Sequence, residues 1–248
     1  MEDLVIFRDD EGNKLNGLLT EMTRDWIVIL VHGFRSDKNN SVGIKLTEVL
    51  NSQNISTFRF DMFGHGESDG KFEDFTITRG TNGILSAIEM LKEMGFKNIG
   101  LFGSSMGGIC SLVAGRENKD IKFLALKAPV SDYAEQSRLK GNVEKWKDEG
   151  FIEYESKKGG KFKLKYDMYL DAEKNVAYNF ANQINIPVFI VHGDEDITVP
   201  LAHSKKLVKL LPNAKLEILE GCDHWFIGDS FQRMILLVEE FIYKQVKG

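Results

Sequence analysis

Hydrophobic and polar residues change along the chain in short blocks that predict strands and helices in alternation. Runs of apolar and β-branched residues predict strands at 26–31, 55–60, 99–102, 121–128, 188–191 and 215–219. Apolar residues at helical spacing and helix-forming runs predict helices at 41–50, 76–94, 106–114, 202–211 and 231–246. Strands that alternate with helices are typical of a mostly parallel sheet covered by helices on both faces. We therefore expect an α/β fold.

The first twenty residues predict a β-hairpin. Leu4 to Phe7 and Lys14 to Thr20 read as strands, and the turn signal Asp10-Glu11-Gly12-Asn13 lies between them. Such a turn between two short strand-like runs is typical of an antiparallel pair.

A long interruption, from about Ser131 to Asn185, separates two of the predicted core strands. It is charged yet rich in aromatic residues, namely Tyr133, Trp146, Phe151, Tyr154, Phe162, Tyr166, Tyr169, Tyr178 and Phe180. Within it, Phe151 to Tyr154 and Lys161 to Lys165 flank Lys157-Lys158-Gly159-Gly160, which predicts a second hairpin among short helices.

We interpret residues 1–130 and 186–248 as the core and 131–185 as an inserted cap or lid. The reason is that the excursion leaves the sheet at the carboxyl end of a strand, where α/β proteins place their sites. The alternative is a solvated insertion with a small core of its own.

Composition narrows the class of protein. The chain has 248 residues, 42% hydrophobic and 28% charged, with a formal net charge of −5. This balance argues against a nucleic-acid partner, which would need a basic face. No apolar run approaches the roughly 18 residues of a membrane span, and the acidic start lacks the features of a secretory signal. With Cys110 and Cys222 as its two cysteines, we expect a cytoplasmic protein with reduced thiols. The sequence leaves open whether the chain forms a homodimer.

The segment Gly103-Ser104-Ser105-Met106-Gly107 carries the most chemical information. It follows a predicted strand and opens a predicted helix, the context in which G-x-S-x-G forms a nucleophile elbow. The flanking glycines fit this reading, because a side chain there would meet the neighbouring strand or helix. Since three fixed residues also occur by chance, the interpretation of Ser105 as a nucleophile depends on partners elsewhere.

A serine hydroxyl needs a base within hydrogen-bond reach, and the base needs an orienting carboxylate. The chain has five histidines, and only His192, His203 and His224 follow Ser105. A triad in the order serine, acid, histidine requires an acid between the other two. Only His224 leaves room for an acid after the penultimate strand, so we predict His224 as the base.

The candidate acid lies in the segment 192–200. Asp194, Glu195 and Asp196 compete within three positions. We favour Asp196, because it directly precedes the apolar turn that seats the loop. Asp132, which follows the preceding strand, is a lesser alternative.

The oxyanion that develops during acyl transfer needs backbone N–H groups aimed at it. We expect one from Met106, the residue after the nucleophile, and one from Phe34, in the loop after the strand 26–31. Gly33 lets the backbone approach closely at this position.

Several motifs in this order resemble the α/β-hydrolase superfamily over nearly the whole chain. The matching segments are 31–34, 61–68, 103–108, 192–196 and 221–224. Within the superfamily, the chain resembles the cinnamoyl/feruloyl esterases and the monoacylglycerol-lipase-like serine esterases.

This resemblance implies Ser105 as nucleophile, Asp196 as acid and His224 as base, with no metal or organic cofactor. It also implies an eight-stranded sheet in which only the second strand is antiparallel, with the cap inserted after the sixth strand. The segment 61–68 is then mainly a structural turn.

We expect a serine carboxylesterase acting on a small-molecule ester, either cinnamoyl/feruloyl-type or with a short-to-medium acyl chain. A thioesterase, peptidase or acyltransferase with the same triad is the alternative, since one fold hosts many functions. A further alternative is a non-catalytic binding protein. The aromatic residues of 131–185 favour an apolar acyl or aryl group, although aromatics are also the usual core of a small cap.

Overall fold

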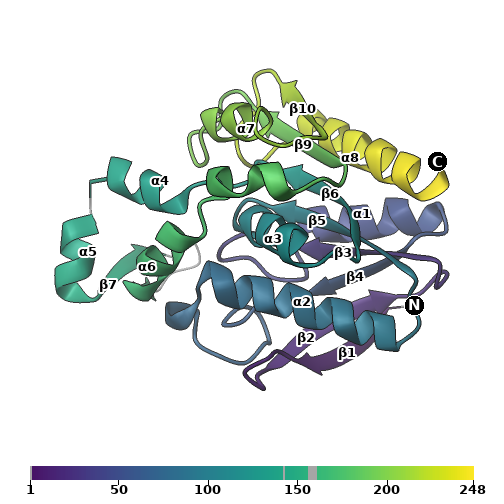
Figure 1. Cartoon of the computed structure of the whole chain (residues 1–248), viewed down its shortest axis with the longest axis horizontal. Helices are drawn as coiled ribbons and strands as arrows, with labels where there is room; N and C mark the ends of the chain where they lie inside the picture. Colours follow the sequence, from purple (N-terminus) through teal and green to yellow (C-terminus); the bar gives the residue numbers. More distant parts are fainter. Residues whose placement is uncertain (1, 142, 156–160) are drawn as a thin grey trace.

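An eight-stranded, mostly parallel β-sheet forms the centre of the molecule (Figure 1). The computed structural model describes residues 2–141, 143–155 and 161–248. The strand order is β1-β2-β4-β3-β5-β6-β9-β10, with the bounds β1 Asp3–Arg8, β2 Lys14–Thr20, β3 Trp26–Val31, β4 Ser56–Phe60, β5 Asn98–Ser104, β6 Ile121–Lys127, β9 Val188–Gly193 and β10 Ala214–Leu219. Only β2 is antiparallel to its neighbours. The expected sheet and its N-terminal hairpin are confirmed.

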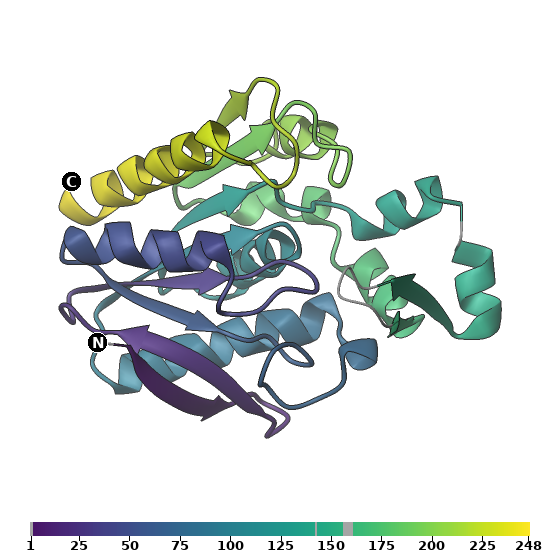
Figure 2. The ribbon, with the colours of Figure 1, turned by 180° about the vertical axis from the view of Figure 1, so that it is seen from behind.

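Two pairs of helices cover the two faces of this sheet. Helices α2 (Ile77–Glu93) and α3 (Met106–Glu117) pack on one face, as Figure 1 shows. Helices α1 (Ser41–Ser52) and α8 (Asp229–Lys247) pack on the other, which faces the viewer in Figure 2. The predicted layered α/β architecture is therefore confirmed.

The two-sided burial explains the continuous apolar run of β3. Successive strand residues point to opposite faces. Val28 and Leu30 join the apolar cluster under α1 and α8, whereas Ile27, Ile29 and Val31 join the cluster under α2 and α3. Because helices cover both faces of the sheet, a polar side chain at any of these positions would be buried.

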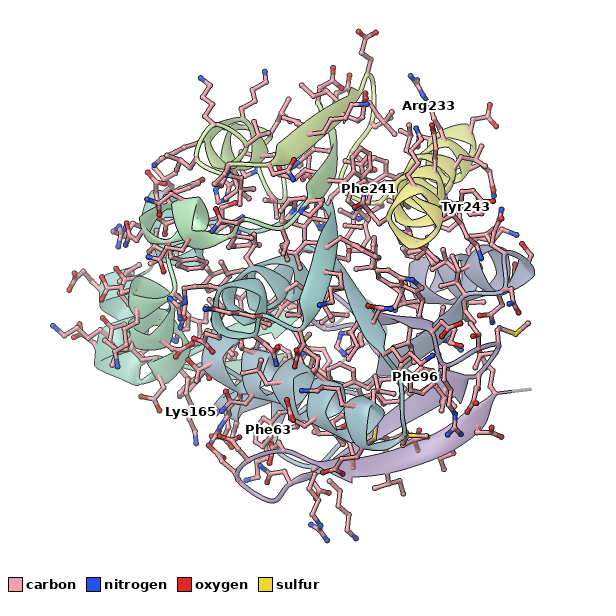
Figure 3. All side chains as sticks on the ribbon, turned by 45° about the vertical axis from the view of Figure 1, so that its right-hand side comes forward. Phe63, Phe96, Lys165, Arg233, Phe241 and Tyr243 are labelled. Carbon is pink, nitrogen blue, oxygen red and sulfur yellow. The ribbon has the colours of Figure 1, made fainter. Side chains whose placement is uncertain are left out.

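Helix α8 completes the second apolar layer. Its Phe241 ring stacks on Phe189 of β9, with 5.3 Å between the ring centroids. Figure 3 shows Phe241 on the sheet side of the helix, with Arg233 and Tyr243 on its outer side. None of the helices in the described part of the chain is long and apolar enough to cross a membrane.

Most helix boundaries agree with the sequence pattern to within a few residues, but the helix predicted at 202–211 is shorter. Helix α7 spans only Ala202–Leu207. Beyond it, the carbonyl of Leu207 accepts from the N–H groups of both Leu210 and Leu211, three and four residues on, at 3.0 and 3.1 Å. The three-residue bond tightens this last turn, and the helix ends shortly before Pro212.

The segment between β6 and β9 leaves the sheet at the carboxyl end of β6 and extends away from the core (Figures 1 and 2). Its elements are α4 Tyr133–Leu139, α5 Val143–Glu149, β7 Phe151–Glu155, β8 Lys161–Lys165, α6 Asp167–Lys174, η2 Ala177–Asn179 and η3 Ala181–Gln183. Strands β7 and β8 pair antiparallel, which confirms the second hairpin. Its predicted turn, 157–160, lies outside the described residues.

This inserted segment packs against the core through both apolar and polar contacts. Trp146 and Met168 belong to the same apolar cluster as the residues under α2 and α3. Lys165 of β8 forms an ion pair of 2.5 Å with Asp74, which ends the short helix η1 (Phe72–Asp74). The inserted apolar side chains thus continue the main core.

Candidate active site

A cleft of about 140 Å³ opens at the carboxyl edge of the sheet, where the predicted chemical residues gather. Ser105, His224 and Phe34 all line it, together with Ser104 and Lys127. They come from the ends of β3, β5 and β6 and from the loop after β10. Parallel strands end at the same edge, so residues far apart in the chain meet there.

Ser105 occupies a strained turn between β5 and α3. Its backbone has φ 55° and ψ −112°, a region that residues with a Cβ rarely adopt. Strain of this kind costs about 1–3 kcal/mol and persists only where surrounding contacts enforce it. Here the Ser105 N–H donates to Lys127 O at 2.9 Å, and the Ser105 carbonyl accepts from Gly108 N and Val130 N at 3.0 and 3.1 Å.

Close backbone packing explains the glycines of the elbow. A Cβ at Gly107 would lie under 3.0 Å from the carbonyl oxygens of Val31 and His32, and neither backbone atom can move away. Gly103 likewise approaches the backbone of Gly107. The start of α3 can therefore sit directly against the end of β3 only because these positions lack side chains.

His224 and Asp196 are in direct contact. His224 Nδ1 lies 2.6 Å from Asp196 Oδ2, and both side chains are buried. Because the carboxylate accepts, Nδ1 carries the proton and Nε2 is the basic nitrogen. Among the hydrogen bonds of the described residues, none joins His224 to Ser105 Oγ. The two residues share the cleft, and such contacts are often long in a site without substrate.

The Asp196 carboxylate receives hydrogen bonds from its own loop. Oδ1 accepts from the N–H groups of Thr198 and Val199 at 2.9 and 2.8 Å. Burial raises the pKa of the Asp196 carboxyl, but hydrogen bonds from His192 and His224 outweigh it and hold the pKa well below its usual range. The group is therefore a carboxylate at neutral pH.

The His192 ring contacts the Asp196 carboxylate, a role that sequence reasoning missed. Its Nε2 lies 2.9 Å from the carbonyl of Val199 and 3.3 Å from Asp196 Oδ2, so Nε2 must carry the proton. Its Nδ1 then accepts from the Ser204 hydroxyl at 2.6 Å. The spacing of His192 and Asp196 gave no signal for this, because the contact depends on how the loop folds back.

The competing carboxylates lie elsewhere. Asp194 and Glu195 are exposed. Asp132 caps α4 by accepting from Glu135 N at 2.8 Å. In the described part of the chain, none of the three forms a hydrogen bond with His224, whereas Asp196 does.

The two expected oxyanion donors are available. Met106 is the first residue of α3, and Phe34 lies in the loop after β3. Within the described residues, neither N–H donates to a backbone or side-chain acceptor. The first N–H groups of a helix have no partner inside the helix, so the Met106 N–H has none within α3.

A buried ion pair holds the loop that carries Phe34. Lys38 donates from its backbone N to Asp61 Oδ1 at 2.6 Å and from its Nζ to Asp61 Oδ2 at 2.7 Å. Burial lowers the pKa of the Lys38 ammonium, but hydrogen bonds with Asp61 and Glu67 outweigh this and raise it above its usual value. The turn at 61–68 thus anchors the neighbouring loop, a partnership with Lys38 that the sequence did not indicate.

Aromatic rings gather around Phe34 on the side of the inserted segment. Its ring lies 4.8 Å from Phe72, 6.5 Å from Tyr133 and 5.9 Å from Tyr154, measured between centroids. The Tyr133 and Tyr154 hydroxyls are 3.1 Å apart. The core and the insertion thus jointly build an aromatic wall, and Phe34 is the member of it that lines the cleft. No cluster of three or more His, Cys, Asp or Glu side chains in the described ranges is placed to hold a metal ion.

Comparison with known proteins identifies the family. The family model described as serine aminopeptidase, S33, matches residues 23–166, and the model for the alpha/beta hydrolase fold matches residues 125–231. The chain belongs to the serine aminopeptidase S33 family of α/β-hydrolases. The superfamily resemblance inferred from the motifs is therefore confirmed.

The relatives of this α/β-hydrolase include proteins named for different activities. Serine hydrolase BPHL of Mus musculus is 27% identical over 210 residues, covering 78% of this chain and 71% of the relative. The mitochondrial palmitoyl-protein thioesterase ABHD10 of Bos taurus is 25% identical over 226 residues, covering 88% and 73%. Among solved structures, Est1E from Butyrivibrio proteoclasticus with ferulic acid bound is 28% identical, with a TM-score of 0.85 and coverage of 98% of this chain and 100% of that one.

We predict that Gly107→Ala destabilises this α/β-hydrolase by roughly 2–5 kcal/mol, because the new methyl group meets backbone atoms of β3. Urea denaturation followed by circular dichroism measures the change. Gly115→Ala, near the end of the same helix, is the control, because its Cβ would meet only the flexible Leu124 side chain at 3.1 Å or more. Equal stability of the two variants would contradict the close packing argued for the elbow.

A second prediction concerns acid stability. The folded state lowers the pKa of Asp196 below the value of about 3.9 in an unfolded chain. Its hydrogen bonds therefore stabilise the fold fully above that pH, and the contribution is lost as the pH falls toward the lowered pKa. We expect the urea midpoint of the wild type to drop more between pH 6 and pH 3 than that of Asp196→Asn.

Asp194→Asn removes the same charge from an exposed neighbour and is the control for this measurement. It should show the wild-type drop. Parallel pH curves for the wild type and Asp196→Asn would mean that the Asp196 carboxylate does not stabilise the fold.

Proposed function

We propose that this α/β-hydrolase is a serine carboxylesterase that works through an acyl-enzyme intermediate. The observation that carries the proposal is the buried contact of 2.6 Å between His224 Nδ1 and Asp196 Oδ2, beside a cleft that Ser105 also lines. A serine in a strained elbow, a base with its basic nitrogen free and an ionised acid are the three parts that nucleophilic acyl transfer requires.

In the proposed reaction, Ser105 Oγ attacks the ester carbonyl carbon while His224 Nε2 takes the hydroxyl proton. Asp196 keeps the imidazole in the required tautomer and stabilises its positive charge. The Phe34 and Met106 N–H groups stabilise the negative charge on the former carbonyl oxygen. The carbon–oxygen bond to the alcohol then breaks, and His224 returns the proton to the departing oxygen. Water, activated in turn by His224, hydrolyses the acyl-enzyme and releases the acid.

The aromatic wall supports an apolar or aryl acyl group. Phe34 and Phe72 come from the core, and Tyr133 and Tyr154 come from the inserted segment, which we propose acts as a cap over the site. The bound ferulic acid in the Est1E structure is an aromatic acid of this kind. We infer the same class of acyl group for this chain.

Thioester hydrolysis is the second candidate, because one relative is a palmitoyl-protein thioesterase. The family description points in addition to peptide substrates. All three reactions pass through the same acyl-enzyme, so the fold does not choose among them. A panel of 4-nitrophenyl esters, acyl-CoA thioesters and aminoacyl amides separates them, and we expect the esters to give the highest kcat/KM.

We also propose that the protein resides in the cytoplasm. Cys110 and Cys222 are both free and buried. Free thiols are usual where the compartment is reducing.

We predict that Ser105→Ala lowers the ester hydrolysis rate by at least about 10⁴-fold, because the variant lacks the hydroxyl that is proposed to form the acyl-enzyme. Steady-state kinetics on the best 4-nitrophenyl ester measures the loss. Labelling by a fluorophosphonate probe, read by intact-protein mass spectrometry, should disappear in the same variant. Near-wild-type activity of Ser105→Ala would exclude the proposed mechanism.

The choice of acid has its own test. Asp196→Asn should lower kcat by about 10⁴-fold, because the amide no longer enforces the correct His224 tautomer. Asp194→Asn should stay within about twofold of the wild type, since Asp194 is exposed. The reverse pattern would assign the role to Asp194.

A further inference from the structure

Lys127 connects the proposed nucleophile and base from inside the protein. It is the last residue of β6, and its carbonyl accepts the Ser105 N–H at 2.9 Å. Its Nζ donates to the His224 carbonyl at 2.7 Å and lies 5.0 Å from the centroid of the Phe226 ring. Only 4% of the residue is exposed. Both the main chain and the side chain of Lys127 therefore contact the catalytic loops.

The buried ammonium has more donors than acceptors. A lysine ammonium carries three N–H groups. In the described part of the chain, the His224 carbonyl is the acceptor that contacts it, and no carboxylate forms an ion pair with it. Burial lowers the pKa of this ammonium to about 8, although the charges of Asp196 and Asp223 raise it. A cation in such surroundings is costly unless an anion binds it.

The cleft that Lys127 lines carries several serine side chains beside the apolar Val42 and Trp225. Ser36, Ser41 and Ser104 line it as well as Ser105. Helix α1 begins at Ser41 and has no acidic residue in its first turn. The positive end of the α1 dipole adds to the lysine charge at this point. This positive charge distinguishes the side from the aromatic wall around Phe34.

The chemistry of the proposed reaction decides which half of the ester enters this side. His224 Nε2 must return its proton to the departing alcohol oxygen, so that oxygen has to lie within hydrogen-bond reach of the ring. His224 borders the same cleft as Lys127. We place the alcohol half on the Lys127 side and the acyl half on the Phe34 side, because the residue that returns the proton contacts Lys127 through its own carbonyl.

We propose that Lys127 is a specificity-determining residue whose ammonium binds a carboxylate on the alcohol half of the ester. This inference rests on the proposed esterase function and deepens it. The substrate class is an ester of a hydroxy acid, in which the free carboxylate lies near the Lys127 Nζ while the ester carbonyl lies at Ser105.

The test compares two esters that share the acyl group preferred in the 4-nitrophenyl panel. One is the ester of 4-hydroxybutanoate, which carries a carboxylate, and the other is the ester of 1-pentanol, which is neutral and of similar length. At pH 7 we expect the wild type to favour the carboxylate ester by about tenfold in kcat/KM, the effect of one hydrogen bond to a charged group. Lys127→Met should lose this preference.

The ratio of the two kcat/KM values is the readout, because a general loss of activity in Lys127→Met cancels from it. Lys122→Met makes the same change at an exposed position near the start of the same strand and should keep the wild-type ratio. A wild-type ratio of one or less, or the same ratio in Lys127→Met as in the wild type, would overturn the proposal. In the latter case Lys127 would only position the loops.

Binding of 4-hydroxybutanoate itself decides the matter if Lys127→Met does not fold or if neither ester is hydrolysed. Calorimetry should show that the wild type binds 4-hydroxybutanoate at least about tenfold more tightly than 1-pentanol. Equal or weaker binding would refute the Lys127 site. Hydrolysis by Ser105→Ala would instead refute the proposed esterase mechanism, so the two failures can be told apart.

Discussion

The arrangement of the cleft depends on the buried carboxylate of Asp196. A carboxylate inside a protein must fill its acceptor positions, or the fold loses several kcal/mol. Here two backbone N–H groups of its own loop and the His224 ring meet that need, with His192 beneath. The hydrogen bonds that offset the cost of burying the Asp196 charge also fix the tautomer of His224. Stability and the proposed chemistry therefore have one physical origin.

A second buried aspartate, Asp61, holds the loop that carries Phe34. Asp61 directly follows β4, and its carboxylate oxygens accept from Lys38 and from the N–H of Glu67. His32 adds further hydrogen bonds near this loop. Its Nε2 accepts from Met62 N at 3.0 Å, so Nδ1 carries the proton that faces the Gly33 carbonyl. Burial lowers the pKa of His32, which keeps it neutral in this role. The loop that presents Phe34 is thus held by charge and hydrogen bonds rather than by apolar packing alone.

The cleft has two chemically different sides. One side is formed by Phe34, whose ring contacts Tyr133 and Tyr154 of the inserted segment. The other holds polar side chains and the ammonium of Lys127. An ester has two halves that separate during the reaction, and a site that distinguishes them can select both. The strained turn at Ser105 stands at the boundary.

The sequence by itself determined the elements and their order. Period and apolar runs are local properties, so β3 could be predicted from Trp26–Val31, and the elbow from the strand, glycines and helix around Ser105. Chain order was enough to select His224 as the candidate base and to favour an acid in 194–196 over Asp132, because strand ends in a parallel sheet meet at one edge. The shortening of α7 was not predictable, since one turn of hydrogen bonds decides it.

Only the tertiary structure decided what surrounds these residues. The partner of Asp61 is Lys38, 23 positions away, and the partner of the Lys127 ammonium is the His224 carbonyl, 97 positions away. A lysine at the end of a strand reads as an exposed charge, and a histidine before a loop reads as a candidate base. Whether such a group is buried, neutral or left with spare donors depends on contacts between distant segments, and no local pattern of residues encodes those contacts.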